Sequence, residues 1–177
     1  MVINLTKRGC YKLEKNITTQ QNTTSLKTIN VKAIINNEQY SGTQNLSELE
    51  SLARDNPNDV TAQINAGISA YSNSNYTKAI EYYNNAIKID PNNGVAYNNL
   101  GNVYLRGLSK PNIALTYYEK ATQVEPFYNY GWLNLALCQQ KLGDKEGTKA
   151  TIAQGLKVLD INDTIAASLK ELQGEFK

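Results

Sequence analysis

The 177-residue sequence predicts an all-α protein, a solenoid of stacked helix–turn–helix units. Three observations predict it. Prolines recur at 34- and 35-residue intervals, at Pro57, Pro91 and Pro126. Between them, each unit contains two stretches whose apolar residues are three and four apart, which is the helical period. Small and aromatic residues also fall at matching places in successive units. The chain is therefore expected to contain a repeated structural unit.

Residues 1–44 precede the repeats and are expected to form a mostly irregular arm, flexible or docked against the rest. The segment is rich in Thr, Asn and Gln, as in "NITTQQNTTSLKT", and has too few apolar residues to bury much surface alone. Only "INVKAII" (residues 29–35) alternates in a way that weakly indicates a strand.

The repeat domain is expected to span residues 45–177. It begins with a leading helix, because "NLSELESLARD" places Leu46, Leu49 and Leu52 on one helical face. Three units follow, at about residues 60–93, 94–128 and 129–162. A capping helix over 163–176 is predicted by apolar residues that are four, three and four apart: Ile165, Leu169, Leu172 and Phe176.

The middle unit has the fullest set of repeated residues: Tyr97, Leu100, Gly101, Tyr104, Ala114, Tyr118, Ala121 and Pro126. The first unit departs from this set at three places: Gln63, Ala66 and Ala70. The third unit keeps Trp132 and Leu135 but degenerates in its second half. Terminal repeats are expected to be atypical because one of their faces meets water.

The order of these residues resembles the tetratricopeptide repeat family. The resemblance implies a right-handed superhelix with a concave groove, acting as a non-catalytic protein-interaction scaffold. Within each unit, Gly67 and Gly101 are expected to let the first helix approach the second closely, while Tyr83 and Tyr118 fill the space between units. The extra residue of the second unit lies in "RGLSKPN", where Pro111 can begin a helix.

The composition argues against catalysis and against a nucleic-acid partner. The formal net charge is only +2, with no Lys/Arg cluster beyond Lys7-Arg8. The chain has no histidine, the commonest general base and metal ligand. Cys10 and Cys138 are far apart in sequence, so neither a zinc site nor a disulfide framework is expected, and Cys138 is interpreted as a small buried residue. We therefore expect no enzyme activity, no metal and no cofactor.

The sequence contains neither a true phosphate-binding loop nor a stretch long and apolar enough to span a membrane. "GDKEGTK" (residues 143–149) looks like a phosphate-binding loop, but its spacing is too short and it is predicted to be a turn. No stretch approaches the roughly 18 apolar residues of a membrane span, so direct membrane insertion is not expected. The modest charge and the Thr/Asn-rich arm point weakly to a bacterial protein, either extracytoplasmic or tethered through a missing N-terminal anchor.

The predicted binding residues are asparagines of the groove. The sixth position of each unit, counted with Gln63, Tyr97 and Trp132 as the fourth, is Asn65, Asn99 and Asn134. The family resemblance implies that this position faces the groove and hydrogen-bonds the main chain of an extended peptide. An Asn amide offers an acceptor and two donors, which match a peptide unit without reading its side chain.

Four neighbouring residues complete the predicted peptide-binding site: Asn98, Asn102, Arg106 and Tyr130. Arg106 is the candidate for contacting an acidic group on the ligand. Asparagine is abundant, at 23 of 177 residues, so compositional accident is the alternative explanation of the pattern. Apolar residues at the outer groove positions argue against a clamp for a free C-terminal carboxylate.

Two functions follow from these observations. The first is an adaptor that holds an extended segment of a partner protein in its groove. The second is an assembly subunit or homo-oligomer in which residues around 29–35 occupy the groove of their own or a neighbouring chain. Truncation of residues 1–40 separates the two, because self-occupancy predicts that truncation increases partner binding or breaks an oligomer.

Overall fold

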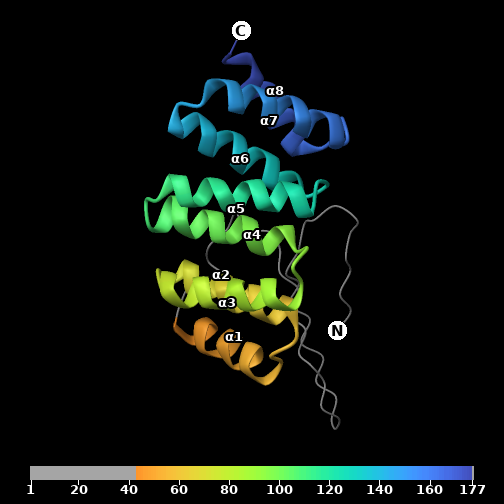
Figure 1. Ribbon diagram of the computed structural model, residues 1–177. Helices are drawn as coiled ribbons and strands as arrows, with labels where there is room; N and C mark the ends of the chain where they lie inside the picture. The colour runs from red at the N-terminus through yellow and green to blue at the C-terminus, as the bar shows by residue number, and fades with distance from the viewer. Residues whose placement is uncertain (1–42, 177) are drawn as a thin grey trace. The chain divides into compact units, whose positions relative to one another are not determined.

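The computed structural model describes residues 43–176, whose regular elements are all helical (Figure 1). The predicted arm and the strand expected over 29–35 lie outside the described residues, apart from the two residues that begin the first helix. The helices are α1 (Thr43–Asp55), α2 (Val60–Ser72), α3 (Tyr76–Ile89), α4 (Gly94–Asn102), the π-helical turn η2 (Val103–Gly107), α5 (Pro111–Val124), α6 (Asn129–Leu142), α7 (Lys145–Val158) and α8 (Thr164–Gly174).

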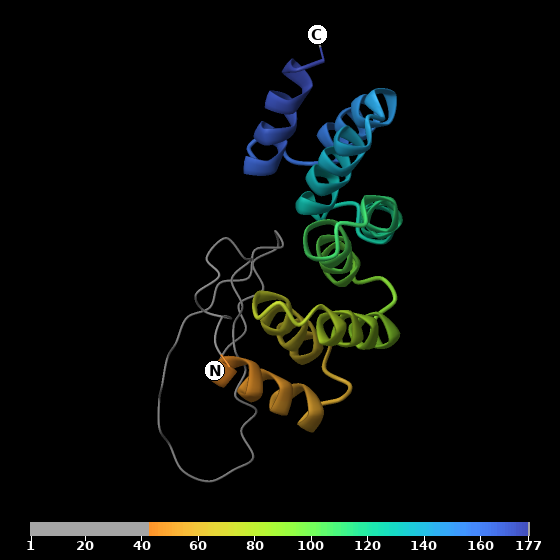
Figure 2. The same ribbon diagram turned by 90° about the vertical axis from the view of Figure 1, so that its left-hand side faces the viewer.

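Helices adjacent in sequence pack against each other throughout the described residues. The three pairs are α2 with α3, α4 with α5 and α6 with α7, and each pair contacts the next through α3–α4 and α5–α6. Figure 2 shows the pairs stacked on one another, with α1 before them and α8 after them. The predicted all-α helix–turn–helix solenoid, with its leading and closing helices, is confirmed.

Small residues on the first helix of a pair meet tyrosines of the second. A Cβ added at Gly67 would lie 2.5 Å from Cε1 of Tyr83, so the glycine is what allows the two helices to approach. Gly101 and Tyr118 repeat this contact in the next pair. Both rings are almost wholly buried, at 2% and 0% exposure. In the third pair Ala136 takes the glycine's place and packs in one cluster with Trp132, Ile152, Leu169 and Leu172.

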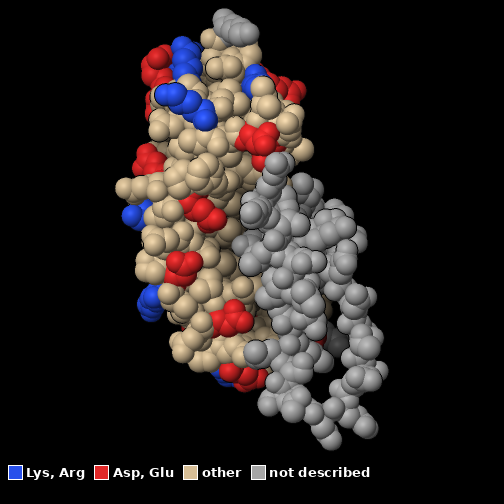
Figure 3. All heavy atoms as spheres, turned by 90° about the vertical axis from the view of Figure 1, so that its right-hand side faces the viewer, with Lys and Arg blue, Asp and Glu red and all other residues tan. Residues whose placement is uncertain are grey.

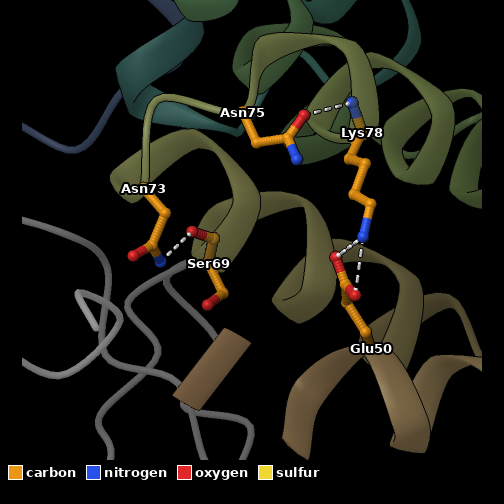
Figure 4. Close-up of polar contacts among 5 residues, drawn as sticks. All are labelled: Glu50, Ser69, Asn73, Asn75 and Lys78. Atoms are coloured by element: carbon orange, nitrogen blue, oxygen red, sulfur yellow. Dashed lines mark hydrogen bonds and ion pairs between the residues drawn. The ribbon is translucent and has the colours of Figure 1, made fainter. Parts of the chain in front are cut away.

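Side chains with an acceptor oxygen begin most of these helices. Asp59, Asn75, Asn93, Asp144 and Asp163 each accept a backbone N–H from the first turn of the helix that follows. At α3, Asn75 Oδ1 accepts from Lys78 N at 3.2 Å, and Lys78 Nζ then reaches Glu50 of α1 at 2.7 Å (Figure 4). The caps thus set where each helix begins.

The extra residue of the second unit is absorbed at the end of its first helix. There η2 replaces the α-helical turn, with Leu108 N donating to Val103 O at 2.9 Å. A Cβ at Gly107 would lie 2.8 Å from Cε1 of Tyr76, so the π-helical turn lies close against the preceding unit. Pro111 occupies the first turn of α5, as predicted.

Candidate functional site

The three predicted sixth-position asparagines lie on the first helices of the three pairs: Asn65 on α2, Asn99 on α4 and Asn134 on α6. All three are buried, with exposures of 5%, 9% and 8%. Asn98 of α4 is buried as well. We call the surface carrying Asn65, Asn98, Asn99 and Asn134 the asparagine face.

Asn98, Asn134 and Arg106 are brought together in one chain of hydrogen bonds. Asn134 Nδ2 donates to Asn98 Oδ1 at 2.9 Å, which joins α6 to α4. Arg106 Nη2 donates to Asn134 Oδ1 at 3.4 Å. Asn98 Nδ2 in turn donates to the Tyr128 hydroxyl oxygen at 3.3 Å. The network spans the second and third units.

Tyr128 belongs to this network but was not among the predicted residues. It immediately precedes α6, at the place where the preceding unit has the helix-capping Asn93. The repeat pattern has no distinctive residue immediately before the first helix of a unit. The only signal in the sequence is that four of the six residues in "FYNYGW" (127–132) are aromatic. Tyr130, which was predicted, has its ring centroid 6.1 Å from that of Tyr128.

Asn102 is engaged within its own helix pair. Its Oδ1 accepts the Tyr118 hydroxyl at 2.9 Å, which joins α4 to α5. Burial raises the pKa of the Tyr118 phenol well above its usual value, because the phenolate would lose its hydration there. Asn102 therefore keeps the buried hydroxyl of Tyr118 paired, and it takes no part in the Asn98–Asn134 network.

Asn65 and Asn99 differ from the other asparagines of the face. Within residues 43–176, the side-chain amide of neither residue makes a hydrogen bond. A buried polar group without a partner costs about 1–3 kcal/mol, and most such groups in native proteins are paired. Among residues 43–176 these two amides therefore lie buried, one unit apart, without a hydrogen-bond partner.

Arg106 lies in η2 and is exposed, unlike the asparagines it neighbours. Burial raises the pKa of Tyr71, and the nearby positive charge of Arg106 partly opposes this rise. The guanidinium is therefore held toward Asn134 of α6. It makes one long hydrogen bond there and keeps most of its donors available.

The outer positions of the predicted groove are apolar. Ile64 and Ile68 of α2 are buried, at 8% and 4% exposure. In the third unit, Leu133 and Leu137 are partly buried and pack against the cluster that contains Trp132. The first and third units therefore have apolar side chains at the groove positions that flank their asparagines in sequence.

A cavity of about 680 Å³ lies between α1 and α3. It is lined in part by Gln63, the residue at which the first unit departs from the aromatic pattern. Gln63 Nε2 donates to Ala53 O at 2.9 Å, and Gln63 Oε1 accepts from Asn85 Nδ2 at 3.4 Å. The Lys78–Glu50 ion pair of Figure 4 also lines this cavity.

The described residues contain no helix long and apolar enough to cross a membrane. Within the same residues, no three His, Cys, Asp or Glu side chains are grouped so as to hold a metal ion. Cys138 is fully buried, as predicted, and burial raises the pKa of its thiol.

Comparisons with known proteins match the repeats. Residues 67–106 match the family model described as "TPR repeat", and residues 95–128 match "Tetratricopeptide repeat". The chain is 30% identical over 119 residues to the STIP1 homolog of Dictyostelium discoideum, covering 67% of this chain and 21% of that protein. It is 25% identical over 130 residues to the peroxisomal targeting signal receptor of Candida glabrata, covering 73% of this chain and 20% of that receptor. The chain thus spans about a fifth of the length of these relatives.

Solved structures with the same fold include MamA and the TPR domain of Arabidopsis OM64. MamA superposes with a TM-score of 0.58 at 17% identity, covering 74% of this chain and 70% of that one. The OM64 domain superposes with a TM-score of 0.57 at 19% identity, covering 69% of this chain and 99% of that one. At these identities the likeness concerns the fold. The matched repeats and the stacked helix pairs together show that the chain belongs to the tetratricopeptide repeat family, a family of protein–protein interaction scaffolds.

Proposed function

We propose that the asparagine face binds an extended segment of a partner protein through that segment's main chain. The observation that supports this most directly is that the buried amides of Asn65 and Asn99 have no hydrogen-bond partner within residues 43–176. A peptide unit presents one C=O and one N–H, which one Asn amide can pair with simultaneously. Binding of the segment would therefore satisfy groups whose burial is otherwise unfavourable.

In this proposal the other asparagines act as a rigid support. Asn98 and Asn134 bond each other at 2.9 Å, which fixes the second unit against the third. Arg106 extends from the same network and is exposed, so it would pair with a carboxylate of the bound segment. The role is one of binding alone and requires no catalytic group.

The test separates binding from folding by means of variants. Asn65→Ala/Asn99→Ala removes the unpartnered amides, and Asn112→Ala removes an exposed asparagine of α5 as a matched control. Partners captured from a lysate by the wild type would be identified, and their segments titrated as synthetic peptides by calorimetry. Two lost contacts of about 1 kcal/mol each weaken binding roughly thirtyfold.

The stability of the same variants distinguishes a ligand-binding role from a structural one. Because the two amides have no partner within residues 43–176, Asn65→Ala/Asn99→Ala should unfold at the same or a higher urea concentration than the wild type. Unchanged peptide affinity in this variant would rule out the proposal. Lost affinity accompanied by lost stability would also count against it, since both amides would then serve the fold.

The self-occupancy alternative makes a different prediction for the same peptides. If the segment 1–44 competed for the asparagine face, removal of residues 1–40 would raise peptide affinity or dissociate an oligomer. If the partner alone uses the face, affinity and sedimentation behaviour stay unchanged on truncation.

A further inference from the structure

The loops that join one helix pair to the next change character along the chain. Their third residues are Asn58 and Asn92 in the first two loops but Phe127 and Ile161 in the last two, at intervals of 34, 35 and 34 residues. Phe127 is 80% exposed and Ile161 is 75% exposed. Large apolar residues therefore stand in water at the positions where the earlier loops have amides.

The two apolar side chains lie on loops that are hydrogen-bonded to each other. Asn129 Nδ2 donates to both carboxylate oxygens of Asp163, at 2.9 and 3.1 Å. Asn129 lies two residues after Phe127, and Asp163 lies two residues after Ile161. Their hydrogen bonds hold the two loops together, so Phe127 and Ile161 lie on adjacent loops.

The loops that join the helices are acidic. The joining segments 56–59, 90–93, 125–128 and 159–163 contain five acidic residues and no Lys or Arg: Asp59, Asp90, Glu125, Asp160 and Asp163. Figure 3 views the molecule from the side on which these loops lie in Figure 1, and Asp and Glu side chains appear at successive levels of it. Partners that bear positive charge are favoured here.

We propose that the edge formed by Phe127 and Ile161 is a second docking surface, which takes a partner segment combining apolar side chains with Lys or Arg. Apolar side chains of that segment cover Phe127 and Ile161, which are exposed far beyond what the fold requires. Its cations pair with the carboxylates of the joining loops. This site lies on the joining loops, whereas Asn65 and Asn99 of the proposed peptide site lie on α2 and α4.

A synthetic peptide of alternating Leu and Lys, labelled with fluorescein, tests the proposal by fluorescence anisotropy with the full chain. The test variant is Phe127→Ser/Ile161→Ser. The matched control is Ile113→Ser, because Ile113 is an apolar residue of α5 that is 42% exposed. It lies near the start of a 14-residue helix, roughly 20 Å from the loop that carries Phe127.

The wild type and Ile113→Ser should bind the Leu/Lys peptide with equal affinity, and Phe127→Ser/Ile161→Ser should bind at least tenfold more weakly. A matched Leu/Glu peptide should not bind the wild type, and added salt should weaken the Leu/Lys complex. Equal losses in both serine variants would overturn the proposal, as would equal binding of the Leu/Glu peptide or no binding of the Leu/Lys peptide by the wild type. Sedimentation that shows a wild-type dimer, absent in the double variant, would assign the surface to a second copy and overturn it as well.

Discussion

Gly67 and Gly101 determine how closely the two helices of a pair approach. Each faces a buried tyrosine ring of the second helix, and a β-carbon at either position would overlap that ring. The ring has nowhere to move, because Tyr83 and Tyr118 are enclosed on all sides. The space left by the partner helix, and not helix propensity, therefore limits these two positions to glycine.

Gly67→Ala should destabilise the protein by about 1–3 kcal/mol, the usual cost of overpacking, although alanine is the better helix former. Gly174→Ala serves as its control, since a β-carbon at Gly174 would meet nothing within 4 Å. Urea unfolding measures both. A Gly67→Ala protein as stable as the wild type would mean that the helices separate without cost.

Four buried or half-buried phenols make the protein sensitive to alkali. Burial raises the pKa of Tyr71, Tyr82, Tyr117 and Tyr118. Because their folded pKa values exceed the unfolded value of about 10, their contribution to stability is complete below pH 10 and falls as the pH rises beyond it.

Tyr118→Phe should therefore weaken the loss of stability above about pH 10, when the free energy of unfolding is measured by urea titration at several alkaline pH values. At neutral pH the same variant should be less stable by about 1 kcal/mol, because Asn102 Oδ1 loses its donor. If the free energy of unfolding fell with pH above pH 10 as steeply in Tyr118→Phe as in the wild type, the raised pKa of Tyr118 would not contribute to the sensitivity to alkali.

At the scale of the element, the helix caps do more than start helices. Asp144 caps α7 by accepting from Gly147 N at 2.9 Å, and it is exposed. Asp163 caps α8 by accepting from Ile165 N at 2.7 Å and also binds Asn129 of the preceding unit. One aspartate thus serves its own helix, while the other joins two units.

Asp144→Ala should cost about 1 kcal/mol, the ordinary value of a cap. Asp163→Ala should cost at least twice as much, because the buried Asn129 amide also loses its acceptor. Thermal or urea unfolding of the two single variants gives the comparison. Equal losses would show that the Asn129–Asp163 hydrogen bonds contribute nothing to stability.

The helices could be predicted from sequence because prolines and apolar spacing are local signals that recur from one unit to the next. The π-helical turn η2 could not be predicted from sequence. The 35-residue interval shows that a residue is inserted, but whether it lengthens the loop or the helix depends on packing, here the contact of Gly107 with Tyr76. The same division applies to the candidate site. The register of the repeats is enough to select Asn65, Asn99 and Asn134, whereas the role of Tyr128 and the Tyr118–Asn102 hydrogen bond depend on contacts between helices.

At the scale of the whole molecule, helices pack almost entirely against their neighbours in sequence. Stability in such an array is a sum of terms for single units and for adjacent interfaces. The middle pair α4–α5 has a neighbouring pair on each side. The third pair relies on α8, whose Leu169 and Leu172 cover Trp132 and Ile152.

The position of a core defect should therefore determine how far it spreads. Leu169→Ala and Leu100→Ala both remove side chains that are 0% exposed, and each should cost about 2–5 kcal/mol. Leu169 lies in the end helix, so its loss should speed amide hydrogen exchange in α6–α8 and leave α2–α5 protected. Leu100 lies on the central α4, and its loss should speed exchange in every helix, because both adjoining pairs lose their support. If Leu169→Ala raised exchange in α2 as much as in α8, the described helices would unfold as one cooperative unit and not as a stack.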